Sequence, residues 1–224
     1  MKSTVLAIAA VLAVTTAGAA NAAVFVTSTF GAPDLGPRTG ETLIIDFDDG
    51  LGGLEVEAGV TLAGDYSTTD VSVGGVRAAP ALDKTFYLSV PDTVSNGSAT
   101  MSFDTFLGGR GVRKFSFYWG SIDNYNDLEL LDKDGATFYT LNGLSIPPAN
   151  GDQGDKATNR RVNFYLTDDS VNLGGLKFKS TQYAFETDTF SFAVVPEPGT
   201  WALMILGFGG AGAMLRRSRR LVAA

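Results

Sequence analysis

Polar side chains gather in one short stretch directly after a run of aromatic residues. The stretch reads FYWGSIDNYN and covers residues 117–126. Gly120 can break the strand that carries the aromatic residues, so that the polar groups fall in a loop. Loops at the rim of a β-fold often carry binding groups. An aromatic ring can stack on the apolar face of a sugar while amides and carboxylates bind its hydroxyls or a metal. The candidate ligand contacts are Trp119, Ser121, Asp123, Asn124, Tyr125 and Asn126.

The same stretch has a plainer interpretation. Trp119 would belong to the core, and the Asp and Asn side chains would stabilise an ordinary turn between two strands. The two interpretations differ in one observable, because the first needs an accessible Trp119 and the second buries it. Both remain open at the level of the sequence.

A second group of candidate ligands consists of carboxylates near the two ends of the body. Asp46 and Asp48 alternate with Phe47, which places both carboxylates on one face of an extended strand. Ca²⁺ takes six to eight oxygen ligands, and acidic pairs on neighbouring strands can supply several of them. The alternative is a solvated acidic edge that discourages pairing between sheets. The candidate ligands of a structural calcium ion are therefore Asp46 and Asp48 near the start of the body and Glu186 and Asp188 near its end.

The segment DKDG, residues 132–135, resembles the start of a calcium loop but is better explained as a turn. An EF-hand loop that starts at Asp132 needs Glu at its twelfth position, where this chain has Gly143. Alternating runs flank the segment, and Gly135 is placed for a left-handed conformation. We therefore predict a β-hairpin at this position.

The absence of two residue types narrows the chemistry further. The chain has no Cys and no His, which excludes disulfides, His-ligated zinc and His-based catalytic triads. Paired carboxylates could still catalyse glycoside hydrolysis. The Glu residues of the body are few and form no evident pair, so we expect no enzyme activity; they are Glu41, Glu55, Glu57, Glu129 and Glu186.

The body between the two terminal segments is strongly acidic. Without one Lys at the N-terminus and one Glu and four Arg at the C-terminus, 12 basic and 23 acidic residues remain, a formal charge of −11. This charge argues against binding to nucleic acid or anionic lipid. It is compatible with calcium and with a soluble extracellular domain.

The elements that must position these groups are strands. Short aromatic and β-branched runs recur between clusters of Gly, Asn, Asp and Pro, and helical periodicity is nearly absent. These short runs predict one antiparallel β-sandwich of jelly-roll type over residues 23–195. Within it, residues 147–161 are expected to form a long polar loop. The expected strands are Thr42–Phe47, Val60–Leu62, Phe86–Val90, Ala99–Phe103, Lys114–Trp119, Asp127–Leu131, Thr137–Leu141, Arg161–Leu166, Leu176–Ser180 and Phe190–Val194.

The first 22 residues have the pattern of a signal peptide. Lys2 precedes an uninterrupted apolar run, and small residues lead to Ala20-Asn21-Ala22. This order fits signal peptidase, with cleavage between Ala22 and Ala23.

The C-terminal segment, residues 196–224, reads PEPGTWALMILGFGGAGAMLRRSRRLVAA. Its apolar part is short for a membrane span, but the Arg side chains can extend outward and allow it to cross a thin membrane as a transmembrane helix. The Arg cluster would remain in the cytoplasm. The motif residues are Pro196, Glu197, Pro198, Trp201, Ala202, Arg216, Arg217, Arg219 and Arg220.

The segment has three parts: the Pro-Glu-Pro element with Trp201-Ala202 behind it, an apolar Gly-rich stretch, and an Arg cluster. In this order they resemble the PEP-CTERM sorting signal in its PEPxxWA form. The resemblance implies that a membrane enzyme, exosortase, recognises the Pro-Glu-Pro element and removes the tail. The precursor would be held in the membrane by this tail, and the product would reach the cell surface or the medium, often in bacteria that make exopolysaccharide.

The body is similar to a family of exosortase-dependent surface proteins of unknown function. Three blocks carry the similarity: ALDKTFYLSV, KFSFYWGSIDNYNDLELLDKDG and QYAFETDTFSF. It implies a surface location and a β-sandwich but no activity. We expect a non-enzymatic envelope or extracellular-matrix protein associated with exopolysaccharide or the cell surface. The alternative is a jelly-roll carbohydrate-active enzyme with paired carboxylates.

Overall fold

The alternating aromatic pattern of KFSFYW does form a strand with one buried face. In the computed structural model, which describes residues 24–30, 40–47, 59–167, 173–195 and 198–222, this strand is β7 (Val112–Gly120). Phe115, Phe117 and Trp119 are fully buried. Side chains two residues apart in a strand share one face, which explains why these three rings enter the core together.

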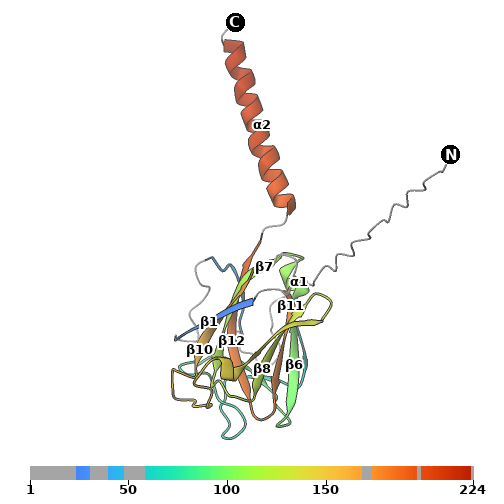
Figure 1. Cartoon of the computed structure of the whole chain (residues 1–224). Helices are drawn as coiled ribbons and strands as arrows, with labels where there is room; N and C mark the ends of the chain where they lie inside the picture. Colours follow the sequence, from blue (N-terminus) through green and yellow to red (C-terminus); the bar gives the residue numbers. More distant parts are fainter. Residues whose placement is uncertain (1–23, 31–39, 48–58, 168–172, 196–197, 223–224) are drawn as a thin grey trace, which may run out of the picture.

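The described strands form two antiparallel sheets that face each other (Figure 1). One sheet has the order β1-β10-β7-β12-β5-β4, and β2 also pairs with β12. The other has the order β3-β6-β11-β8-β9. The first sheet contains β1 (Val24–Phe30), β2 (Leu43–Ile45), β4 (Ser67–Thr69), β5 (Tyr87–Val90), β7, β10 (Arg160–Leu166) and β12 (Phe185–Val194).

The second sheet has fewer strands than the first, and short helical turns follow two of them, β6 and β9. Its strands are β3 (Thr61–Gly64), β6 (Gly97–Ser102), β8 (Asn126–Asp132), β9 (Thr137–Asn142) and β11 (Leu173–Ser180). The helical elements of the described residues are α1 (Asp104–Leu107), η1 (Gly143–Ser145) and the C-terminal α2 (Pro198–Val222).

Stacked aromatic rings join the two sheets. Trp119 lies parallel to Phe185 with 4.3 Å between ring centroids. Phe178, from the second sheet, meets Phe185 and Phe190 edge-on. Aromatic pairs of this kind contribute about 0.5–1.5 kcal/mol beyond the area that they bury. The core is therefore aromatic along β7, β11 and β12.

The prediction of an all-β antiparallel sandwich is confirmed, and each of the ten expected strands overlaps an observed one. The strand order does not confirm the finer assignment to the jelly-roll type. Two observed strands were not expected, β1 and β4. The signal peptide and its cleavage site lie outside the described residues, as does Asp48.

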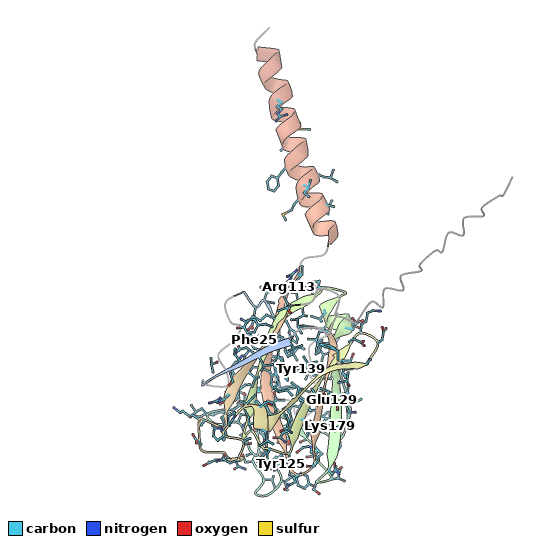
Figure 2. All side chains as sticks on the ribbon, viewed as in Figure 1. Phe25, Arg113, Tyr125, Glu129, Tyr139 and Lys179 are labelled. Atoms are coloured by element: carbon cyan, nitrogen blue, oxygen red, sulfur yellow. The ribbon has the colours of Figure 1, made fainter. Side chains whose placement is uncertain are left out.

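The direction of β12 separates two ends of the sandwich. This strand begins at Phe185 beside the end of β7 and leads, ten residues later, to the segment that precedes α2. Ten extended residues span roughly 33 Å. Tyr125 lies at the end of the sandwich away from α2, and Arg113 lies at the end nearer to it (Figure 2).

Candidate functional site

A polar cleft of about 190 Å³ lies at the end of the sandwich away from α2. Four segments that are distant in the sequence form it: the loop before β5, the turn between β7 and β8, the loop before β10, and the start of β12. Its polar side chains come from Arg77, Ser121, Asp123, Tyr125, Gln153, Tyr183 and Glu186. Three of them belong to the stretch FYWGSIDNYN.

Glu186 is the most deeply buried carboxyl group of the cleft, with only 2% of the residue exposed. Its Oε1 accepts a hydrogen bond from the backbone N–H of Ala78 at 2.9 Å, and its Oε2 accepts one from the Ser121 hydroxyl at 2.7 Å. Burial raises the pKa of Glu186 to about 8, although both hydrogen bonds favour the charged form. Most Glu186 side chains are therefore protonated at neutral pH.

Asp123 lies in the turn between β7 and β8 and is half-buried. Its backbone N–H donates to Oδ1 of Asn126 at 3.0 Å, which fixes the turn. A Cβ on Gly151 would come within 2.4 Å of Asp123 Oδ1, and Gly151 has φ +64°. Only glycine leaves room for the Asp123 carboxylate in this position.

Burial also raises the pKa of the Asp123 carboxyl, and the nearby Tyr125 hydroxyl opposes that shift. No basic side chain among the described residues forms an ion pair with Asp123. The hydroxyl of Tyr125 donates to the carbonyl of Tyr183 at 2.8 Å. Burial and the charge of Asp123 raise the pKa of Tyr125, so its phenol stays protonated.

Arg77 is the basic residue of the cleft wall, and its guanidinium is already engaged. Nη1 forms an ion pair with Asp92, and Nε donates to the carbonyl of Val71. The carboxylate of Asp92 therefore balances the positive charge of Arg77. The carboxylate of Asp123 is not balanced in this way by any basic side chain of the described residues, so it makes the electrostatic potential of the cleft negative.

The polar loop before β10 packs onto the turn that carries Asp123. Oδ1 of Asn159 accepts from the backbone N–H groups of Ala81 and Ser121, at 2.8 and 3.0 Å. Gly151 N–H donates to the carbonyl of Ile122. One buried amide thus ties together three of the segments that form the cleft, which gives the loop of residues 147–161 a defined position.

The structure divides the candidate contacts of FYWGSIDNYN into two groups. The prediction of Trp119 as a ligand contact is wrong, because its ring is fully buried against Phe185. The prediction of Asn126 as a ligand contact is also wrong, because this side chain is buried too. It is fully buried, and its amide donates to Oγ of Ser180 and to the carbonyl of Ala184.

The remaining contacts lie at or near the cleft. Ser121, Asp123 and Tyr125 line it. Asn124 is exposed beside them, between Asp123 and Tyr125. Whether any of them binds a ligand stays a prediction.

The three described residues proposed for calcium, Asp46, Glu186 and Asp188, do not form one cluster of acidic ligands. Glu186 faces the cleft, whereas Asp188 is buried opposite Tyr118, which in turn pairs with Arg161. No three acidic side chains within the described ranges lie close enough to hold a metal ion. Asp46 is half-buried at the end of β2. Strand β2 does pair with β12, as the hypothesis required, but both oxygens of Glu186 accept hydrogen bonds from Ala78 and Ser121.

The DKDG segment is a turn, as predicted. Strands β8 and β9 pair across it, and Gly135 has φ +82°. Oδ1 of Asp132 accepts from the backbone N–H groups of Asp134 and Ala136, at 2.9 Å each. Its carboxylate therefore stabilises the turn.

The comparisons with known proteins concern the C-terminal segment. Residues 194–220 match the family model described as the PEP-CTERM protein-sorting motif. The chain carries a PEP-CTERM motif. This match confirms the resemblance of the C-terminal segment to the PEP-CTERM sorting signal and supports an exported, exosortase-sorted surface protein. A search of curated proteins found no match.

The PEP-CTERM tail is helical from Pro198 to Val222 as α2. None of the helices in the described part of the chain has the length and hydropathy of a membrane span. The sorting motif itself implies a precursor that is anchored in the membrane before it reaches the surface.

Sequence reasoning missed three polar residues of the cleft, Arg77, Gln153 and Tyr183, and it separated Glu186 from Asp123. No local pattern marks Arg77, which reaches the cleft from a loop before β5. The loop that carries Gln153 was noted for its length alone. Glu186 and Asp123 were each singled out, but for different ligands.

Proposed function

We propose that the chain is a non-enzymatic surface or extracellular-matrix protein that binds exopolysaccharide in the cleft around Asp123. One observation carries this proposal: a cleft lined by hydroxyl, carboxyl, amide and guanidinium groups lies at the end of the sandwich away from the PEP-CTERM tail. While the tail holds the precursor in the membrane, this end can face outward. Polar groups convergent on one cleft favour a hydroxyl-rich ligand.

The size of the cleft fits a small part of a polymer. Its volume of about 190 Å³ is below the roughly 300–1,000 Å³ of pockets for drug-sized ligands. Tyr125 and Tyr183 supply aromatic surface on its wall. We expect one sugar unit of a chain to enter, while the rest of the polymer stays in solvent.

The test is calorimetric titration of the purified full chain with exopolysaccharide from its host. Asp123→Asn removes the charge of the cleft and keeps its size. Loss of one charged hydrogen-bonding group costs about 1.5–3 kcal/mol, or roughly ten- to 150-fold in affinity. Asp134→Asn is the matched control, because Asp134 is exposed in the β8–β9 turn.

Unchanged affinity of Asp123→Asn would contradict the proposal, as would a wild-type chain that binds no host polysaccharide. Equal losses in Asp123→Asn and Asp134→Asn would indicate a general charge effect and would also contradict it.

A second function, glycoside hydrolysis, is favoured by one specific observation. Asp123 and Glu186 line the same cleft, and the raised pKa of Glu186, about 8, suits a general acid. Against this stands the burial of Glu186, both of whose oxygens already accept hydrogen bonds. An assay of reducing ends released from host polysaccharide separates the two functions. We expect no release, and release that Glu186→Gln abolishes would establish the enzyme.

A further inference from the structure

Building on the glycan-binding function proposed above, we infer that the cleft recognises a sugar with a free amino group, whose ammonium ion pairs with the Asp123 carboxylate. The ligand class is thus a cationic, hexosamine-containing polysaccharide rather than a neutral or an acidic one.

The unbalanced charge of the cleft is the first argument. Asp123 has no ion-pair partner among the described basic side chains, although it is half-buried. Arg77, on the same wall, is engaged by Asp92 and by the carbonyl of Val71. A carboxylate held in a partly dry site favours an ammonium over a neutral hydroxyl, because two opposite charges attract each other more strongly where less water screens them.

The position of Asp123 is the second argument. The Asn126 side chain fixes its turn, and Gly151 packs so closely on its carboxylate that an added Cβ would lie 2.4 Å from Oδ1. The carboxylate is therefore oriented before any ligand arrives. A preorganised partner reduces the entropic cost of binding.

The rest of the lining discriminates against N-acetylated and acidic sugars. Val76 and Ala184 are the only aliphatic side chains among the described lining residues, so an N-acetyl methyl group finds few aliphatic contacts beside the rings of Tyr125 and Tyr183. A uronic acid would bring its carboxylate toward Asp123, where like charges repel. Specificity for the free amine then results from both attraction and exclusion.

The charge of the whole body points the same way. Residues 23–195 carry a formal charge of −11, which attracts a polycation over a distance set by the salt concentration and repels a polyanion. A divalent cation suits the cleft less well. Ca²⁺ needs six to eight oxygen ligands, and both oxygens of Glu186 already accept hydrogen bonds.

The experiment compares three defined probes by titration of the full chain in the presence of a chelator. They are a hexamer of β-1,4-linked glucosamine, its fully N-acetylated counterpart and a hexamer of galacturonic acid. We expect the glucosamine hexamer to bind at least tenfold more tightly than the other two. Asp123→Asn should weaken that binding about ten- to hundredfold, and Asp134→Asn should not.

Each other outcome overturns the inference in a recognisable way. If the acetylated or acidic hexamer binds as tightly and depends on Asp123, the amine specificity is wrong while the glycan cleft stands. If the glucosamine hexamer binds equally well to Asp123→Asn, binding is spread over the acidic surface and the inference is overturned. If no hexamer binds but host polysaccharide does, the inference is overturned alone, and if neither binds, the proposed function fails as well. The preference of the wild-type chain among the probes stands even if Asp123→Asn does not fold.

Discussion

At the scale of single residues, the stretch FYWGSIDNYN combines both of its interpretations. Trp119 and Asn126 are buried and structural, whereas Asp123 and Tyr125 line a cleft. Alternation along β7 was enough to predict a common face for Trp119 and the Phe residues. Which of the following polar side chains turn inward depends on Ser180 and Ala184, far along the chain, and no local pattern gives that contact.

Asn126→Ala should destabilise the fold. The substitution leaves the Asp123 N–H, Ser180 and Ala184 without their buried partner. Unsatisfied buried polar groups cost about 1–3 kcal/mol each, so we expect the free energy of unfolding to fall by at least that amount. Denaturant unfolding measures it. Asn124→Ala is the control, since Asn124 is exposed and should stay within about 0.5 kcal/mol.

Glu186 should make the fold less stable as the pH rises. Its pKa of about 8 lies above the ordinary value of 4.5, so the folded chain keeps a proton that the unfolded chain has lost. The free energy of unfolding should therefore fall between about pH 4.5 and pH 8 and remain level above that. In Glu186→Gln this decline should disappear.

Glu129 provides a control of opposite sign. Although burial raises its pKa, hydrogen bonds from Lys179 and Thr137 outweigh that effect, and its pKa is lowered. Its contribution should be lost as the pH falls below the ordinary value. Glu129→Gln should change the acidic limb of the stability profile and leave the decline toward pH 8 intact. A profile of Glu186→Gln that still declines would refute the assignment to Glu186.

At the scale of elements, the strands were predictable and the cleft was not. Aromatic and β-branched runs indicate β5 to β12 because alternation is a local property. The short β4 contains only Ser and Thr, and β1 lies directly after the expected signal peptide, so neither gave a distinct signal. The cleft depends on contacts between residues 65 to 108 positions apart, such as Ser121 and Ala78 with Glu186.

The loop before β10 should control the position of Asp123. Gly151→Ala would place a methyl group 2.4 Å from Asp123 Oδ1 and would require a non-glycine residue at φ +64°. We expect lower stability and at least tenfold weaker binding of polysaccharide, because the carboxylate must move. Titration and thermal melting measure both effects.

The matched substitution is Gly154→Ala in the same loop. Its added Cβ would meet Asp152 Oδ1 at an ordinary 3.5 Å. Binding should remain as in the wild type. Loss of affinity in both variants would show that the loop acts by its general order, rather than through Asp123.

At the scale of the whole molecule, the sorting tail and the acidic body fit one order of events. The PEP-CTERM motif at residues 194–220 directs an exported precursor to the surface. Strand β12 connects the two ends of the sandwich, so the tail leaves from one end while the cleft lies at the other. The motif could be predicted from the sequence because it is short, its parts follow one another in a fixed sequence, and its composition differs from that of the body.

Processing at both ends should be visible in the intact mass of the protein from its host. The signal pattern predicts a mature N-terminus at Ala23, and exosortase processing predicts loss of the segment from Trp201 to Ala224. A mature species that retains this segment would contradict processing of the tail. A chain that begins at Met1 would contradict export through a cleaved signal peptide.

Hydrogen–deuterium exchange with and without host exopolysaccharide tests the location of the binding site most directly. Bound sugar should slow exchange in residues 121–126 and 150–154, which form the turn and the loop around Asp123. The β8–β9 turn at residues 132–136 should exchange as before. If protection falls on that turn or on another part of the sandwich, or if exchange does not change anywhere, the cleft is not the polysaccharide site.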